Sequence, residues 1–241
     1  MSRKAARSPG RPLVLVFGES EHDSRAIKAL VAGLAPGLKH SVEHRRQPLV
    51  LIKNALPKKA RSNAEKIADL ARIEGRVRRV LAVLAHEDCD AIEPEHLEVA
   101  DRIESELRSV GCPNPIAVTP AWEIEAWWLI FPEAVGKLVE GWREPSDWLG
   151  RDVGRLKDAK EQLSRAVQPR PAGRSSPRAY HERDSIEIAQ NIVADGLLTS
   201  FADGRRSTRH AGGSLKHTRS GSFEQFRQKV LRIAASLASR A

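Results

Sequence analysis

Apolar residues gather in four short runs along the first half of the chain. Each run is dense in Val, Leu and Ile without a clean polar alternation, as in strands that are covered on both faces. We therefore predict four buried strands. The runs are residues 12–17, 48–52, 79–85 and 115–119.

Segments with helical spacing of apolar residues lie between these strands. The pattern predicts helices over residues 24–34, 63–73 and 95–110. Alternation of strands and helices is typical of a mainly parallel, helix-covered sheet. The predicted fold class is thus α/β, with a sheet of about four strands in a domain over residues 12–140.

A strongly apolar segment follows the last predicted strand. Residues 122–131 are long enough for three helical turns, and all five tryptophans fall between Trp122 and Trp148. We predict a buried helix whose tryptophans pack the junction with later helices. The alternative is an aromatic platform for nucleobase stacking.

The rest of the chain is predicted to extend the α/β domain at its C-terminal side. Residues 141–241 are interpreted as a C-terminal helical extension that ends in an amphipathic helix over 223–237. Within it, 168–182 and 204–222 are predicted to be basic loops, and residues 1–11 a basic flexible tail.

Composition places the chain among ordinary globular proteins. It is 41% hydrophobic and 29% charged over 241 residues, and no run approaches the roughly 20 apolar residues that span a bilayer. We expect a cytoplasmic protein without membrane contact. Cys89 and Cys112 are too few for a disulfide framework or a zinc cage.

The net charge of +9 adds a candidate partner. A basic surface attracts phosphate backbones through counterion release, so nucleic acid, DNA or RNA, is the first partner to consider. The alternative is a surface of solvated Lys and Arg side chains.

Acidic side chains follow two of the predicted strands. Glu19 comes after the first strand, and the turn His86-Glu87-Asp88-Cys89-Asp90 comes after the third. Ligands of open parallel sheets bind beyond the carboxyl ends of the strands, and carboxylates on separate strand ends suit Mg²⁺. The acids therefore indicate a divalent-metal site, although solvated turns have the same composition.

Three segments resemble motifs of TOPRIM domains, the fold of topoisomerases, DnaG-type primases and OLD-family nucleases. Residues 14–23 resemble the strand that delivers the family's glutamate, here Glu19, and residues 80–90 resemble the strand that ends in Asp-x-Asp. Residues 120–129 resemble the Glu-x-Trp helix of small stand-alone DUF4276 and RloB-like proteins, with Glu125 at the acidic position.

The second motif admits two registers. One uses His86 and Asp88, and the other uses Asp88 and Asp90, so Asp88 belongs to both. A neutral His86 would favour Mn²⁺ over Mg²⁺. On a helix, Glu123 and Glu125 would point about 200° apart, so only one of them could face the site, and the resemblance favours Glu125.

The resemblance implies an Mg²⁺- or Mn²⁺-dependent nuclease acting on phosphodiesters of DNA or RNA. Metal ligands would come from Asp88, Asp90, Glu125 and Glu19, and Glu19 could instead be the general base or acid. The expected contacts with the nucleic acid are Arg45, Arg46, Arg183, Arg205 and Arg206.

Two further expectations concern partners. No Gly-x-x-x-x-Gly-Lys phosphate loop is present, and the family resemblance implies a separate ATPase partner in anti-phage defence. Association into a homodimer is a further alternative that the sequence leaves open. The alternative to an enzyme is a non-catalytic subunit that binds nucleic acid or protein through a degenerate site.

Overall fold

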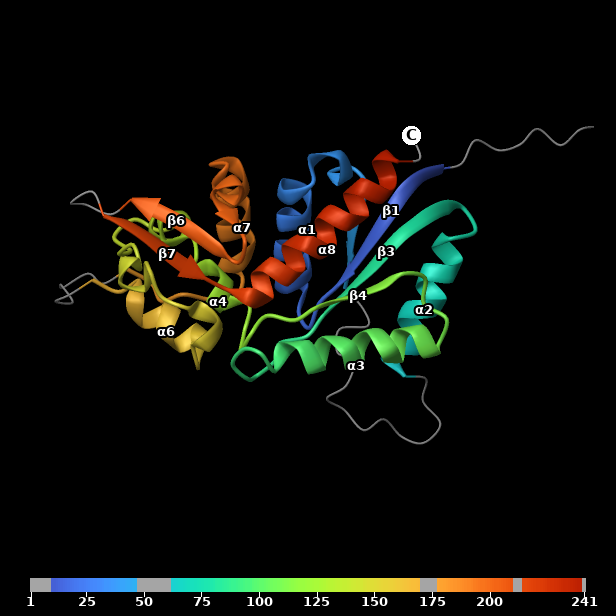
Figure 1. Ribbon diagram of the computed structural model, residues 1–241, viewed down its shortest axis with the longest axis horizontal. Coiled ribbons are helices and arrows are strands. Elements are labelled where there is room, and N and C mark those ends of the chain that lie inside the picture. Colours follow the sequence, from blue (N-terminus) through green and yellow to red (C-terminus); the bar gives the residue numbers. More distant parts are fainter. Residues whose placement is uncertain (1–9, 47–61, 170–176, 210–213, 240–241) are drawn as a thin grey trace, which may run out of the picture.

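Four parallel strands form the main sheet of the computed structural model (Figure 1), which describes residues 10–46, 62–169, 177–209 and 214–239. Their order is β2-β1-β3-β4, so the first and third strands are neighbours. The strands are β1 (Gly10–Phe17), β2 (Val42–Arg45), β3 (Arg78–His86) and β4 (Pro115–Val118). The predicted α/β fold with a parallel sheet of four strands is confirmed.

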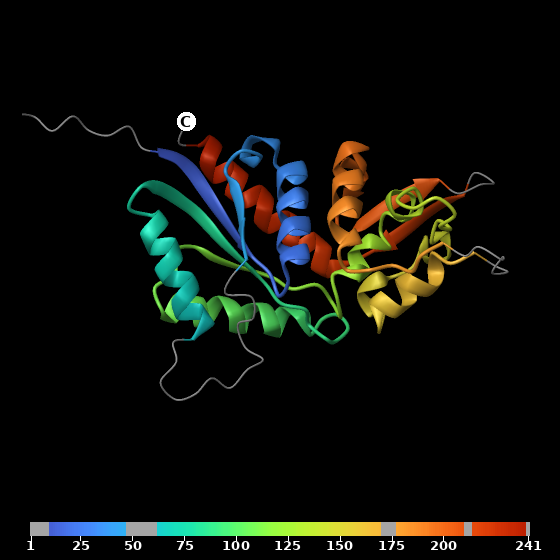
Figure 2. The same ribbon diagram turned by 180° about the vertical axis from the view of Figure 1, so that it is seen from behind.

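Helices cover both faces of this sheet (Figures 1 and 2). Successive side chains of a strand point to opposite faces. Val14 and Val16 accordingly join the core under α1 and α8, whereas Leu13 and Leu15 join a second core under α2 and α3. This two-sided burial explains why the strands read as unbroken apolar runs. The helices are α1 (Glu21–Leu34), α2 (Asn63–Glu74), α3 (His96–Ser109) and α8 (Gly221–Ala238).

The second half of the chain packs against the same core as the sheet. Its helix α7 (Asp184–Ala194) lies alongside α1, and a Cβ on Gly33 of α1 would come within 2.5 Å of Val193 Cγ2. Only glycine permits this approach. The predicted C-terminal extension is therefore continuous with the α/β domain. Its other helices are α4 (Glu125–Trp128), α5 (Pro132–Gly136) and α6 (Ala159–Ala166), with 3-10 turns at Pro36–Leu38, Ser146–Trp148, Val153–Arg155 and Leu197–Ser200.

The three-turn helix predicted over residues 122–131 is wrong. Helix α4 is a single turn, because Trp122 has a positive φ of 58° and Phe131, which precedes Pro132, leaves the helical region. The packing role of the tryptophans is nevertheless confirmed for Trp127, whose ring stacks on Phe226 with centroids 5.1 Å apart.

The basic loop predicted over residues 204–222 also differs. It contains β6 (Arg205–Arg209) and β7 (Leu215–Arg219), which form an antiparallel sheet with β5 (Phe201–Ala202). These strands lack an apolar run because Arg206 and Thr218 occupy the buried face in place of aliphatic residues. Burial in this sheet was therefore invisible to a hydrophobicity pattern.

Two other expectations concern residues that are not described. The strand predicted over 48–52 lies outside the described residues, as do positions 1–9 of the basic tail and 170–176 of the other basic loop. The strand that borders β1 is instead β2, which pairs Val42 with Val14.

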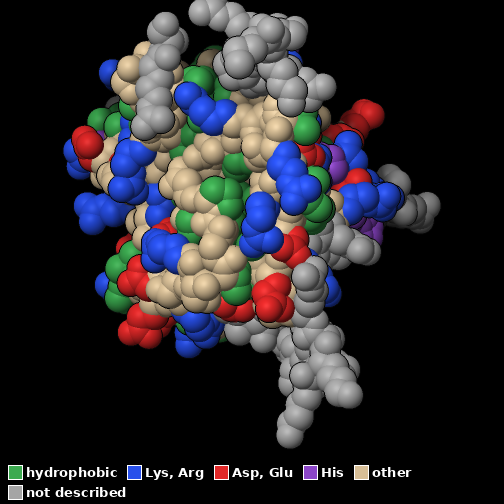
Figure 3. Space-filling model, turned by 90° about the vertical axis from the view of Figure 1, so that its right-hand side faces the viewer, with side chains coloured by type: hydrophobic (Ala, Val, Ile, Leu, Met, Phe, Trp, Pro, Cys, Tyr) green, Lys and Arg blue, Asp and Glu red, His purple; other side chains and the backbone are tan. Residues whose placement is uncertain are grey.

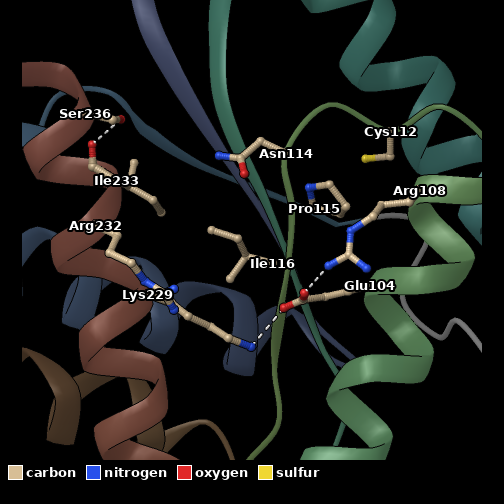
Figure 4. A pocket seen from close by; sticks show the side chains of 10 residues that line it. All are labelled: Glu104, Arg108, Cys112, Asn114, Pro115, Ile116, Lys229, Arg232, Ile233 and Ser236. Carbon is tan, nitrogen blue, oxygen red and sulfur yellow. Dashed lines mark hydrogen bonds and ion pairs between the residues drawn. The ribbon is translucent and has the colours of Figure 1, made fainter.

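An ion pair covers the outer edge of the main sheet at β4 (Figure 4). The amide of Ala117 donates to Glu104 Oε1 at 3.1 Å, and Lys229 Nζ donates both to the carbonyl of Ala117 at 3.1 Å and to Glu104 Oε1 at 2.9 Å. Pro115, two residues earlier, has no amide hydrogen to offer. The edge strand is thus closed to pairing at these positions, at the floor of a groove of about 610 Å³ between α3 and α8.

None of the helices in the described part of the chain combines the length and the apolar character needed to cross a membrane. At the end of the molecule seen in Figure 3, Lys and Arg side chains are interspersed with Asp and Glu. The positive net charge therefore does not make this end uniformly basic.

Candidate functional site

The strand ends predicted to carry the acids are adjacent in the sheet. Phe17, the last residue of β1, pairs with Ala85 of β3, so Glu19 and the turn after His86 lie beyond the same carboxyl edge. This edge is where ligands of parallel α/β sheets bind. The prediction that Glu19 and Asp88 share one region is supported by this register.

A tight turn fixes Glu19 between β1 and α1. Ser20 caps α1, with its hydroxyl accepting from the amide of Asp23 at 3.1 Å while Asp23 Oδ2 accepts from the amide of Ser20 at 3.0 Å. A Cβ on Gly18 would come within 2.8 Å of the backbone nitrogen of Ser24. Glycine before Glu19 is therefore required by the closeness of the turn to the first turn of α1.

His86 lies buried at the centre of the acidic residues. Its Nε2 is 3.2 Å from Asp88 Oδ1, and its Nδ1 is 4.0 Å from Asp23 Oδ2. Burial by itself lowers the pKa of His86, but the contact with Asp88 and the charges of Asp88, Asp23 and Glu19 outweigh it and raise the pKa to about 9. The ring nitrogens make no hydrogen bond of good geometry within the described residues, so the interaction is an ion pair.

The raised pKa gives His86 a second role beside that of the predicted metal ligand. An imidazolium carries a proton on both nitrogens and has no lone pair for a metal. In this protonated state His86 is an internal counter-charge to the carboxylates, and it would have to lose a proton to bind a metal ion.

Asp88 connects the end of β3 to the segment before α4. Its Oδ1 accepts a hydrogen bond from the amide of Ile124 at 3.1 Å. β3 ends at His86, and Asp88, which both registers of the second motif share, is the second residue after the strand.

Asp90 is placed differently from Asp88. It is exposed, has a positive φ of 53°, and its amide donates to the carbonyl of Trp122 at 3.0 Å. The charge of Asp88 acts on the pKa of Glu125, whereas that of Asp90 acts on the thiol of Cys89. Of the literal Asp-x-Asp pair, Asp88 is the residue whose charge acts on both His86 and Glu125.

Glu125, the first residue of α4, is buried beside Asp88. Burial and then the charge of Asp88 raise the pKa of Glu125 to about 8, although a hydrogen bond from Tyr180 works in the opposite direction. The hydroxyl of Tyr180 lies 2.9 Å from Glu125 Oε1 and 2.7 Å from Ser185 Oγ, which also accepts from the indole of Trp128 at 3.0 Å. The side chain of Glu125 is therefore held by a buried chain of hydrogen bonds.

Glu123 also belongs to the cluster, contrary to the geometric argument from a helix. It lies before α4, so the 100° rotation per residue does not apply to it. Its Oε2 accepts from the amide of Lys160 at 2.9 Å, and burial followed by the charge of Asp88 raises its pKa. Both acids thus face the same region.

A cationic hollow of about 450 Å³ adjoins Tyr180. His22, Lys160, His181 and Arg183 line it, together with Glu182, whose carboxylate pairs with the ammonium of Lys160. Of the five predicted nucleic-acid contacts, Arg183 therefore lies beside the acidic cluster. Tyr180 and Lys160 are not among the site residues predicted from the sequence.

Arg45 ends β2 opposite Phe17 of β1, so Arg45 and Arg46 lie at the same carboxyl edge of the sheet as Glu19. Arg45 pairs with Glu43 at 2.9 Å and Glu74 at 2.8 Å, and the exposed Arg46 pairs with Glu21 at 2.9 Å.

The two arginines of β6 differ from each other. Arg206 is buried, pairs with Glu133 and donates to the carbonyl of Ile130 at 2.9 Å, so it supports the fold and is not available as a backbone clamp. Arg205 is exposed on β6.

The acidic cluster of Glu19, Asp88 and Glu125 supplies possible ligands for the expected metal ion. Among the described residues, no group of three His, Cys, Asp or Glu side chains has the arrangement of a ready-made metal site. The donor chemistry does fit a hard cation, because carboxylates from three separate segments, Glu19, Asp88 and Glu125, gather at one edge. Mutual repulsion of these carboxylates is what a bound cation would relieve.

Comparisons with protein families, with curated proteins and with solved structures found no match for the chain.

Proposed function

We propose that this protein is a metal-dependent phosphodiesterase that acts on nucleic acid. The observation that carries the proposal is the convergence of Glu19, Asp88 and Glu125 beside a hollow lined by Lys160 and Arg183. Carboxylates that hold a cation, next to side chains that bind phosphate, are the two components that phosphodiester hydrolysis needs.

Each residue has a role that follows from its position. Asp88 and Glu125 would hold Mg²⁺ or Mn²⁺, which when bound would supply charge neutralisation at the phosphate. Glu19, at the end of β1, would take a proton from the attacking water or give one to the leaving group. Arg183 and Lys160 would position the phosphate backbone.

Two residues around the carboxylates keep them in place. His86 fixes Asp88 through the 3.2 Å contact, and Tyr180 fixes Glu125 through its hydroxyl. Rigid placement of reacting groups is worth a large part of a catalytic rate. Support for a TOPRIM-type enzyme, for an ATPase partner and for a role in anti-phage defence comes from the sequence resemblance alone.

The test is a cleavage assay with matched variants. Purified protein is incubated with supercoiled DNA, single-stranded DNA and transfer RNA in Mg²⁺, in Mn²⁺ and in EDTA. We expect metal-dependent cleavage that falls by about 100-fold or more in Glu19→Gln, Asp88→Asn and Glu125→Gln. Glu98→Gln and Asp101→Asn, exposed acids of α3, serve as controls with the same chemical change and retain activity. Cleavage that survives all three site substitutions would contradict the proposal.

The second candidate function is a non-catalytic nucleic-acid-binding subunit. The observation that favours it is His86, which already supplies a positive charge to the acids from within the fold. This alternative predicts that the protein binds nucleic acid without cleaving it. Asp88→Asn should then bind as the parent does and should also show no cleavage.

A further inference from the structure

The β6–β7 hairpin presents one face to solvent and buries the other. Along β6, Arg205, Ser207 and Arg209 are exposed, whereas Arg206 between them is buried. Along β7, Thr218 is buried next to the exposed Arg219. We call the solvent side the ribbon face. It consists of Arg205, Ser207, Arg209, Leu215, His217 and Arg219.

The strand register concentrates positive charge on the ribbon face. Arg205 lies directly opposite Arg219, and Ser207 lies opposite His217, with Ser207 Oγ 2.8 Å from the His217 Nδ1 atom. Like charges directly opposite each other destabilise an antiparallel pair. The arrangement is therefore costly unless an anion lies across it.

Nearby acids do not neutralise these arginines. Within the described residues, Arg205, Arg209 and Arg219 form no ion pair. The charge of Arg219 acts on Asp152, but the carboxylate of Asp152 pairs with Arg155 at 3.7 Å. Arg205 and Arg209 are thus without an ion-pair partner among the described residues, and Arg219 shares the charge of Asp152 with Arg155.

Contacts on the buried face and along the edge of β7 hold the hairpin in place. Arg206 pairs with Glu133 across the buried face, the amide of Gly150 donates to Thr218 Oγ1 at 3.0 Å, and the amide of Arg219 donates to the carbonyl of Arg151 at 2.9 Å. These contacts fix the direction of the ribbon face before any ligand arrives.

The end of β7 leads back to the candidate site. Ser222, three residues after Arg219, accepts from the indole of Trp127 in α4 at 3.1 Å. Helix α4 begins with Glu125. The chain after β7 is therefore joined to the element that carries one of the candidate carboxylates.

We infer that the ribbon face docks in the major groove of duplex DNA. Beyond Arg206 and Thr218, where the pairing with β5 and with Asp152 ends, the hairpin has two strands about 4.8 Å apart, which with their side chains fit the roughly 12 Å width of that groove. Arginine is suited to both phosphates and guanine edges. The major groove of duplex RNA is too narrow and deep for such a ribbon. The substrate class named here rests on the proposed function, whereas docking itself can be measured without catalysis.

The test measures binding in EDTA, where no cleavage takes place. Fluorescence anisotropy is recorded with a labelled DNA duplex and with an RNA duplex of the same sequence, for the full chain and for the triple variant Arg205→Gln, Arg209→Gln, Arg219→Gln. We expect this variant to bind duplex DNA at least about 10-fold more weakly. The slope of log affinity against log salt should fall by about 2.7, at about 0.9 for each lost phosphate contact.

A second triple variant controls for net charge. Arg76→Gln, Arg79→Gln and Arg232→Gln remove the same three charges from exposed positions outside the hairpin. Arg79 is the second residue of β3 and Arg76 precedes that strand, whose start lies at the opposite end of the molecule from the hairpin (Figure 1). We expect this control to change the affinity less than about 3-fold.

Circular dichroism and thermal unfolding establish that both triple variants are folded. Equal losses in the two variants, or equal binding of the DNA and RNA duplexes by the full chain, would overturn the inference. Weakened DNA binding in the ribbon variant alone supports it even if no cleavage is ever observed. If the ribbon variant binds duplex DNA as tightly as the parent and the parent cleaves nucleic acid, the inference is contradicted and the proposed function is not.

Discussion

The hydroxyl of Tyr180 donates a 2.9 Å hydrogen bond to Oε1 of Glu125, and so joins α4 to the segment that precedes α7. The two residues are 55 positions apart in the chain and both are buried. This bond links the candidate site to the second half of the molecule, which the sequence suggested was only an appendage.

Replacing this tyrosine tests the link. Tyr180→Phe keeps the ring and removes the donor to Glu125, so we expect the free energy of unfolding to fall by about 1 to 2 kcal/mol. Urea unfolding followed by tryptophan fluorescence measures the loss. Ser185→Ala removes a partner of the hydroxyl and also the acceptor of the buried Trp128 indole, so it should cost at least as much. No change in Tyr180→Phe would show that the bond does not contribute to stability.

Tyr180 also provides its own spectroscopic signal, because it is the single tyrosine of the chain. Burial and the charge of Glu125 raise the pKa of its phenol well above the ordinary value. We expect the ultraviolet difference absorbance of the phenolate to appear only when the protein unfolds in alkali. A titration near the ordinary pKa in the folded protein would contradict the buried position.

The pH dependence of stability should reflect Glu125. Its folded pKa is about 8 and its ordinary value is 4.5, so between these values the folded state holds a proton that the unfolded state has lost. Stability therefore falls as the pH rises from about 4.5 to 8. Glu125→Gln removes this dependence and keeps an acceptor for Tyr180. The free energy of unfolding of the variant minus that of the parent should be larger at pH 8 than at about pH 5, by on the order of 2 kcal/mol.

Urea unfolding at the two pH values measures this difference. Glu98→Gln on α3 is the control with the same chemical change at an exposed position. In the parent protein, Mg²⁺ or Mn²⁺ at pH 8 should raise the unfolding temperature more than in Glu125→Gln, because only the carboxylate attracts the ion. Identical pH profiles for the parent and Glu125→Gln would refute the assigned environment.

The strand-end acids were accessible to sequence reasoning, and the residues that complete the site were not. Glu19 and Asp88 follow apolar runs that mark β1 and β3, so the rule for parallel sheets was enough to place them together. The ambiguity between His86 and Asp90 could not be resolved before the end of β3 was known, because the two registers differ only in where that strand stops.

Glu123 and Tyr180 illustrate two different limits. Helical spacing over the apolar segment turns Glu123 away from Glu125, and the positive φ of Trp122, which excludes a helix there, cannot be seen in a hydrophobicity pattern. Tyr180 reaches Glu125 only through tertiary packing, so no local spacing indicates it. The hairpin was missed for a third reason, since Arg206 is buried through an ion pair with Glu133.

Substitution of His86 tests the counter-charge at the centre of the cluster. The folded pKa of about 9 lies above the ordinary value of 6.5, so its contribution to stability is present below about pH 6.5 and is lost as the pH rises through 9. His86→Gln should therefore destabilise the protein by about 2 kcal/mol at pH 6 and by much less near pH 9.5.

A second buried histidine supplies the control for this trend. Burial lowers the pKa of His96, so its protonation opposes folding as the pH falls. His96→Gln should lose less stability at pH 6 than at pH 8, the reverse of His86→Gln. Unfolding curves for the two variants that change in the same direction with pH would contradict the imidazolium assigned to His86.

The covered edge of β4 leads to a prediction about self-association. Glu104 and Lys229 occupy the amide and carbonyl of Ala117, which an added strand would otherwise use. Replacing both, as Glu104→Gln with Lys229→Met, should expose this position and promote pairing between copies of the chain. Sedimentation velocity should then show dimers or larger species at concentrations where the parent protein shows a smaller average size.

Arg108→Gln removes an exposed partner of Glu104 while leaving Ala117 covered, so it should not alter sedimentation and should change stability by less than about 1 kcal/mol. If the double variant sediments like the parent, the ion pair is not what keeps the edge closed, and Pro115 becomes the residue to test next.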